Sequence, residues 1–112
     1  NLAQDPALPA RFIPAGELAL QLGETELGLN YLSEGSQRRL VHLEDTIHTL
    51  MSARPQDFIQ AKQTFERAAR SATQAHQKLY RAYLNARDPR AREVRSALDA
   101  IQQMIAQARV HK

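Results

Sequence analysis

An uninterrupted apolar seam runs from Phe58 to Ala86, with an apolar residue at alternating steps of three and four. Charged and amide side chains occupy most of the positions between them. This pattern is typical of a long amphipathic helix in a coiled coil or helical bundle. Most seam residues are alanines, which allow a partner helix to approach closely. The nine positions are Phe58, Ala61, Phe65, Ala68, Ala72, Ala75, Leu79, Ala82 and Ala86.

Prolines mark both boundaries of this helix. Pro55 suits a first helical turn, where its missing N–H is harmless, and Asp88 followed by Pro89 suits the start of the next helix. We therefore expect a helix over 55–87, roughly 50 Å long at 1.5 Å per residue, and another over 89–110. The apolar stripe of the last helix consists of Ala91, Val94, Leu98, Ile101, Ile105 and Ala108, flanked by Ala97 and Met104.

A further helix is predicted over 37–52, with Ser36 as its N-cap. The short links near 53–55 and 87–89 force neighbouring helices to run antiparallel, so that their apolar stripes close on one core. The stripe of this helix consists of Leu40, Leu43, Ile47 and Leu50, widened by Val41 and Met51.

Residues 16–35 allow two interpretations, because all four glycines of the chain lie there. At helical spacing, the leucines predict a helix over 17–33 that Gly35 ends in the left-handed conformation. At period two, a β-hairpin with a turn at 23–26 is predicted, and the residues that would share one of its faces are Leu18, Leu20, Leu22, Leu27, Leu29 and Tyr31. Interior glycines destabilise a helix by about 1 kcal/mol each. We nevertheless favour the helix, because Leu, Gln and Glu form weak strands and an isolated hairpin is marginally stable.

The first fifteen residues contain three of the five prolines, which predicts an extended N-terminal arm. Its apolar residues Leu8, Phe12 and Ile13 are available to pin the arm to the bundle. The predicted fold is therefore all-α, an antiparallel three- or four-helix bundle with a Pro-containing N-terminal arm. We expect the arm over 1–15 and the bundle over 16–112, with helices near 17–33, 37–52, 55–87 and 89–110.

The composition excludes several kinds of site. The chain has no cysteine, which rules out disulfides, thiolate zinc sites and a cysteine nucleophile. No apolar run approaches the roughly 18 residues that span a bilayer, and no signal peptide is visible. Because the chain starts at Asn1 rather than Met, we expect an excised domain or a processed chain. The localisation stays open, with an extracytoplasmic or secreted setting among the options.

Charge is distributed unevenly along the chain, although the net charge is only +3. Residues 1–53 hold three basic and seven acidic residues, whereas 54–112 hold twelve basic and five acidic ones. The halves either neutralise each other by packing or present a basic face to an acidic partner. Arginine forks suit phosphates and carboxylates, so we predict contacts with an anionic partner where the long helix ends. The candidates are Arg81, Arg87, Arg90, Arg92 and Arg95.

A second basic patch is expected at the opposite end of an up-down-up bundle, where the 53–55 link meets the C-terminal residues. Two apolar residues lie among the basic ones, a combination that suits contact with an anionic membrane surface. The candidate tip contacts are His48, Leu50, Met51, Arg54, Arg109 and Lys112. Near the first patch, Tyr83 is a better candidate than Tyr80 for a partly exposed anchor, but a tyrosine at the edge of a seam more often flanks the core, and we favour that interpretation.

Motifs for metal, phosphate or catalysis are weak. His42, Asp45 and His48 are spaced by three, which rotates them around a helix instead of aligning two histidines as an i, i+4 pair. Gly23 and Gly28 frame a spacing like that of a phosphate loop, but the Lys and Ser or Thr that should follow are missing. We therefore predict no cofactor, no metal and no catalytic residue.

The predicted function is that of a non-catalytic helical-bundle module, a sensing, adaptor or secretion/targeting domain of a larger bacterial-type protein. Its expected partner is another protein or a second copy of the chain, and no small-molecule substrate is indicated. One alternative is a basic accessory protein that binds nucleic acid, and another is a targeting domain for anionic membrane surfaces. Salt separates these classes, because phosphate-driven binding weakens steeply as salt rises.

Overall fold

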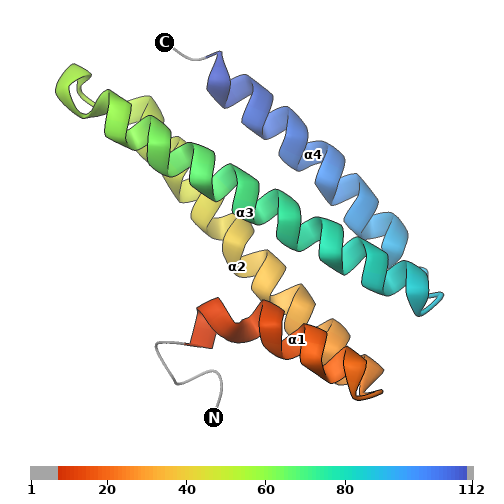
Figure 1. The fold of residues 1–112 in the computed structure, drawn as a ribbon. Helices are drawn as coiled ribbons and strands as arrows, with labels where there is room; N and C mark the ends of the chain where they lie inside the picture. Colours follow the sequence, from red (N-terminus) through yellow and green to blue (C-terminus); the bar gives the residue numbers. More distant parts are fainter. Residues whose placement is uncertain (1–7, 111–112) are drawn as a thin grey trace.

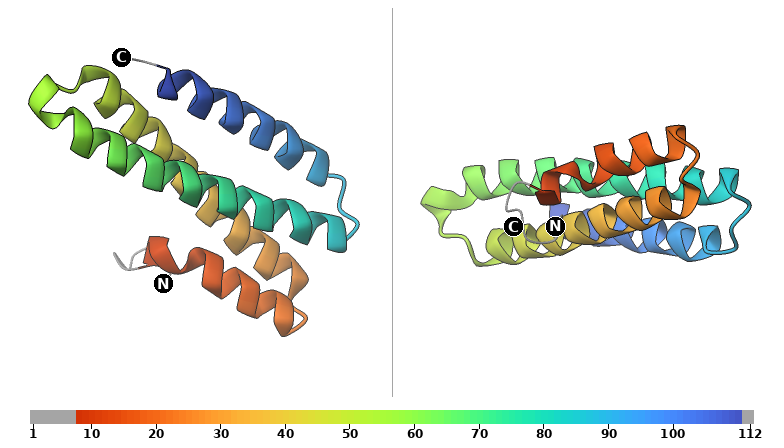
Figure 2. Two further views of the ribbon diagram at one scale, coloured as in Figure 1. Left: turned by 45° about the horizontal axis from the view of Figure 1, so that its top comes forward. Right: turned by 90° about the horizontal axis from the view of Figure 1, so that it is seen from below.

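The computed structural model describes residues 8–110, and all regular elements in that range are helical. The two longest helices form an antiparallel pair, and the first and last helices lie on opposite sides of that pair (Figure 1). Figure 2 shows the resulting flat body, which measures 50 × 31 × 16 Å. The predicted all-α antiparallel bundle is therefore confirmed. The elements are η2 (Leu8–Arg11), α1 (Phe12–Gln21), α2 (Thr25–Ser52), η3 (Pro55–Asp57), α3 (Phe58–Asn85) and α4 (Ala91–Arg109).

The predicted seam forms the core face of α3. Seven of its nine residues are buried, and Phe65 and Ala72 have no exposed surface. Phe58 is half-buried and Ala86, the C-cap of α3, is exposed. The buried face is wider than the predicted narrow seam, because α3 contacts both α2 and α4. The additional buried residues are Ala69, His76 and Tyr83.

The core changes from four helices to three along the molecule. At the end with the α1–α2 turn, which we call the four-helix end, all four helices contribute to one apolar cluster. At the opposite end, which we call the three-helix end, the cluster contains residues of α2, α3 and α4 only. The first cluster includes Ile13, Leu32, Leu79, Tyr83 and Val94, and the second includes Leu43, Leu50, Phe65, Ile101 and Ile105.

The helix break in the N-terminal half lies at Gly23 and not at Gly35, so the predicted helices over 17–33 and 37–52 are wrong in their boundaries. Gly23 has a φ of 83°. Its N–H donates to Leu20 O at 3.1 Å and the N–H of Glu24 donates to Ala19 O at 2.9 Å, the pair of bonds that defines a Schellman motif. The hairpin alternative is also wrong, because helix occupies both sides of this turn.

The other three glycines lie inside helices where α1 crosses α2. A Cβ atom on Gly16 would lie 2.9 Å from the carbonyl oxygen of Gly28, and one on Gly28 would lie 2.9 Å from that of Gly16. A Cβ on Gly35 would meet the side chain of Ile13 at 2.8 Å. These glycines therefore permit close helix contact and do not end a helix.

The predicted extended arm over 1–15 is wrong for its described part, because residues 8–15 are helical. Residues 1–7 lie outside the described range. Pro14 is the third residue of α1, where the backbone N–H has no intrahelical partner and proline costs no hydrogen bond. Phe12 and Ile13 are buried and anchor the segment, as expected.

The C-terminal half follows the sequence prediction closely. All six stripe residues of α4 are buried, with Ala97 and Met104 half-buried beside them. In α2, however, Val41 and Met51 are 47% and 48% exposed and do not widen the core. They lie on the side of α2 that no other helix covers.

Candidate functional site

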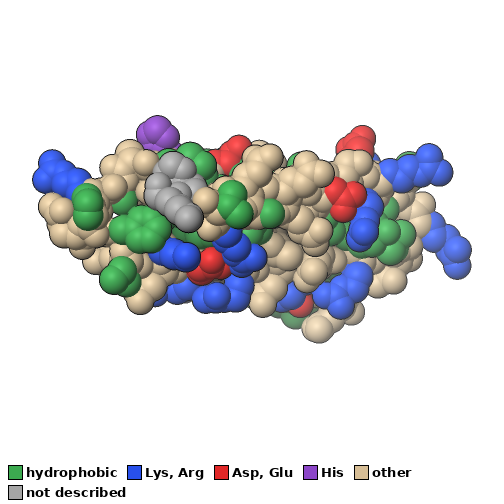
Figure 3. Space-filling model, turned by 90° about the horizontal axis from the view of Figure 1, so that it is seen from above, with side chains coloured by type: hydrophobic (Ala, Val, Ile, Leu, Met, Phe, Trp, Pro, Cys, Tyr) green, Lys and Arg blue, Asp and Glu red, His purple; other side chains and the backbone are tan. Residues whose placement is uncertain are grey.

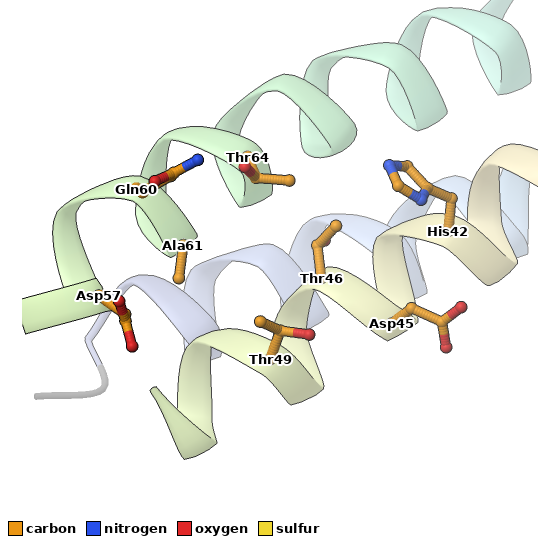
Figure 4. Close-up of a pocket in the computed structure, with 8 residues that line it drawn as sticks. All are labelled: His42, Asp45, Thr46, Thr49, Asp57, Gln60, Ala61 and Thr64. Atoms are coloured by element: carbon orange, nitrogen blue, oxygen red, sulfur yellow. The ribbon is translucent and has the colours of Figure 1, made fainter. Parts of the chain in front are cut away.

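One of the hollows on the described surface is the open half of the groove between α2 and α3 (Figure 4). Helix α1 covers this groove only at the four-helix end, because it begins at Phe12, beside Gly35. Beyond that point the groove is open and measures about 430 Å³. Its lining residues are His42, Asp45, Thr46 and Thr49 of α2, and Asp57, Gln60, Ala61 and Thr64 of η3 and α3. We call this hollow the α2–α3 groove.

The floor of the α2–α3 groove consists of small side chains. Thr46 and Ala61 are buried and point into the space between the helices (Figure 4). The Thr46 hydroxyl donates to Leu43 O at 2.7 Å, so its methyl group faces outward and its hydrogen bond is satisfied. The charged and ring side chains of His42, Asp45 and Asp57 stand at the exposed rim. The groove thus has a small-residue floor and a polar rim.

The predicted arginine cluster lies at the four-helix end. Arg90 donates from Nε and Nη2 to both carboxylate oxygens of Asp88, the shortest distance being 2.6 Å. Its guanidinium also stacks over Tyr83 at 4.9 Å from the ring centroid. Tyr83 is buried, so it belongs to the core, as favoured, and is not a partly exposed anchor. The hydrogen bond from Arg90 lowers the pKa of the Asp88 carboxyl.

The other arginines of the cluster are exposed, but carboxylates share their surface. Arg95 Nε lies 3.8 Å from Asp99, and Glu26 lies near enough to act on Arg90 electrostatically. Figure 3 shows Lys and Arg side chains at both ends of one face, with Asp and Glu among them. The end is therefore of mixed charge and not a purely basic patch. The exposed members are Arg81, Arg87, Arg92 and Arg95.

The predicted tip contacts are only partly brought together. His48, Met51 and Arg54 are exposed at the three-helix end. Leu50 is 3% exposed and packs in the core, so its assignment as a tip contact is wrong. Arg109 bonds Glu66 at 2.7 Å, two turns along α3 from its first residue, so α4 stops short of the α2–α3 tip (Figure 1). Lys112 lies outside the described residues.

A second polar hollow lies beside the apolar cluster of the four-helix end. It lies between α2 and α4, its floor is formed by α3, and it measures about 190 Å³. Sequence reasoning missed it because Ser36 reads as an N-cap and His76 lies one position beyond the seam. The signal that could have found it is a spacing of seven residues, which brings side chains to the same helix face. Ser36 lies midway between the buried Leu29 and Leu43, and His76 lies midway between the buried Ala69 and Tyr83.

Burial of His76 predicts a pH-dependent stability. Desolvation lowers the pKa of its imidazole below the ordinary 6.5, against a smaller opposing effect of its hydrogen bond to Ala72. The unfolded chain therefore takes up a proton near pH 6.5 while the native state stays neutral. We expect the free energy of unfolding to fall as the pH decreases below about 6.5. Urea unfolding of the protein and of His76→Gln between about pH 7.5 and 5.5 measures this; equal pH slopes would contradict it.

The His and Asp residues of α2 do not come together as a set of metal ligands. His42 and Asp45 line the α2–α3 groove but His48 does not, and no group of three or more metal-ligating side chains occurs within residues 8–110. In the same range no helix combines the length and the hydropathy needed to cross a bilayer.

Comparison with known proteins gives no relative. The chain matches no model of a protein family, and no curated protein or solved structure is significantly similar to it.

Proposed function

We propose that the chain is a non-catalytic interaction module that binds a helix of a partner protein in the α2–α3 groove. The observation that supports this most is that α1 covers the α2–α3 groove only at the four-helix end. The uncovered part of the groove forms a hollow of about 430 Å³. Roles as an adaptor, a sensing domain or a targeting domain of a larger protein all use such binding.

The floor of the groove suits a helix. Helix α1 already packs against α2 through Gly16, Gly28 and Gly35, where small residues permit close approach. The open half of the groove is also lined by small side chains, those of Thr46, Ala61 and the half-buried Thr64. Helix-in-groove binding uses an apolar face with anchors at steps of three and four, which fits the length and direction of this groove.

The rim indicates the charge of the partner helix. Asp45 of α2 and Asp57 of η3 both line the α2–α3 groove, so a bound helix would lie near two carboxylates. Such charges contribute to orientation and association rate more than to affinity. We therefore expect a partner helix with small apolar residues on one face and Lys or Arg beside that face.

A photo-crosslinking amino acid at Thr49 tests the proposal in cells that express the protein. Thr49 is exposed and lines the groove, so we expect one discrete protein adduct. Adding Thr64→Trp, which fills the groove, should remove most of that adduct. Gln103, exposed on α4, is the matched control position and should give none. Equal adducts from Gln103, or adducts that Thr64→Trp leaves unchanged, would refute groove binding.

The nucleic-acid alternative is less well supported, because carboxylates share the surface of the arginine cluster. Salt distinguishes the two functions: binding to phosphates weakens steeply between about 50 and 200 mM salt, whereas groove binding through small apolar side chains responds little. Replacement of Arg87, Arg92 and Arg95 by Gln should leave the Thr49 adduct unchanged.

A further inference from the structure

The hollow between α2 and α4 contains two buried polar side chains that the proposed function does not use. Its floor and walls include apolar groups of Leu79, Val94 and Ala97, and its mouth has charged groups from the first turn of α4. Ligand sites of helical bundles are formed in this way, by side chains on facing helices. The remaining lining residues are Ser33, Ser36, Gln37, His76, Tyr83, Arg90 and Glu93.

Ser36 presents an unused hydroxyl to this hollow. Its side chain is 1% exposed, and Oγ has no hydrogen-bond partner among the described residues. A buried polar group without a partner is destabilising, because it has lost its hydrogen bonds to water. A serine on a helix can satisfy its hydroxyl by donating to a carbonyl one turn earlier, and Ser36 does not do so. The hydroxyl is thus available to a molecule in the hollow.

His76 presents a hydrogen-bond acceptor to the same hollow. Nδ1 lies 2.9 Å from Ala72 O, and because a carbonyl oxygen only accepts, Nδ1 must bear the proton. Burial lowers the pKa of the imidazole, so the ring is neutral at pH 7 and Nε2 has a free lone pair. The tautomer therefore follows from the hydrogen bond to the backbone.

The charged side chains that line the hollow are one cation, Arg90, and one carboxylate, Glu93. The guanidinium of Arg90 is already paired with Asp88 and stacked on Tyr83. Glu93 is exposed and forms no ion pair within the described residues. Glu26 acts electrostatically on Arg90 and adds a further carboxylate to this surface. A cation entering the hollow would therefore meet an uncompensated carboxylate.

We propose that this hollow binds a small organic ammonium ion, an amine or amino acid, whose N–H groups donate to Ser36, His76 and Glu93. An ammonium group has three donors and no acceptor, which complements a hydroxyl oxygen, an imidazole lone pair and a carboxylate. Apolar side chains of Leu79 and Val94 contact its carbon chain. At about 190 Å³ the hollow is smaller than typical pockets for drug-sized ligands, which restricts the ligand to few heavy atoms.

The test is an NMR titration of the full chain with ethanolamine hydrochloride, at pH 7.5 and constant ionic strength. Sodium acetate and ethylene glycol serve as the anionic and neutral comparisons. We expect saturable shifts at the amides of Ser33 and Ser36 and at the His76 ring with ethanolamine only. Glu93→Gln, at an exposed position, should weaken ethanolamine binding about tenfold or more. Asp99→Asn on the same helix is the matched control and should leave it unchanged.

Ser36→Ala gives a second, independent variant, because it removes the hydroxyl and adds no bulk at this buried position. It should abolish the ethanolamine shifts while the circular dichroism spectrum remains that of a helical bundle. Saturable shifts with acetate of equal or greater affinity would overturn the proposal in favour of an anion site. Absence of saturable shifts with all three probes, or full binding by Glu93→Gln, would overturn it in favour of a polar core layer without a ligand.

Discussion

Replacing Phe65 by alanine is expected to lower the free energy of unfolding by about 3–5 kcal/mol. The Phe65 side chain has no exposed surface and lies in the cluster that α2, α3 and α4 share. Its removal loses the transfer free energy of the ring and leaves a cavity. At the three-helix end no residue of α1 belongs to that cluster, so few side chains are available to fill the space.

Urea unfolding monitored by circular dichroism measures the effect, with the slope checked for two-state behaviour. The matched control is Phe58→Ala on the same helix, where the ring is only half-buried. Because less of its area leaves water on folding, we expect a distinctly smaller loss of stability there. A loss below about 1 kcal/mol for Phe65→Ala, or equal losses for both variants, would show that the seam is not the core.

Gly28→Val is expected to lower the free energy of unfolding by about 2–3 kcal/mol and to loosen α1. A Cβ at this position would lie 2.7 Å from Leu20 Cγ and 2.9 Å from the carbonyl oxygen of Gly16. The leucine side chain can rotate, but the backbone of α1 can yield only by moving away from α2. That movement would uncover Phe12 and Ile13, which anchor the helix.

Amide hydrogen exchange locates the damage in this variant. We expect faster exchange in α1 and retained protection in the centre of α3, because the three-helix end does not depend on α1. Asn30→Val, at an exposed position of the same helix, introduces the same side chain without a clash. Its stability should change by less than about 0.5 kcal/mol. A Gly28→Val variant as stable as Asn30→Val would show that the helices are not in close contact.

The C-terminal half was predictable because its pattern is unambiguous. Helices α3 and α4 have one apolar stripe each, and the Asp88–Pro89 pair separates them. In the N-terminal half, glycine has two uses that a sequence does not distinguish. Gly23 adopts a left-handed conformation and ends α1, whereas Gly28 lies within α2 where two backbones meet. Only the contact partner, which is distant in sequence, separates a helix terminator from a packing residue.

The candidate sites were less predictable than the fold. Leu50 was expected at the tip, but it lies in the apolar cluster that residues of α2, α3 and α4 share. Arg90 was expected to be available to a partner, but Asp88 occupies its fork. Both outcomes depend on which side chains meet across helices or links. Hydropathy and charge along one helix do not contain that information.

The sequence by itself determined that the chain is helical and which face of α3 and α4 is apolar. In aqueous solution, an apolar stripe at helical spacing is stable only when another helix covers it. The tertiary structure alone decided that α1 covers half of the α2–α3 pair, and this leaves the α2–α3 groove open. It also placed Ser36 and His76 in one hollow. The physical reason is that side-chain periodicity is a property of each helix, whereas grooves and hollows arise from the relative lengths and offsets of helices that pack together.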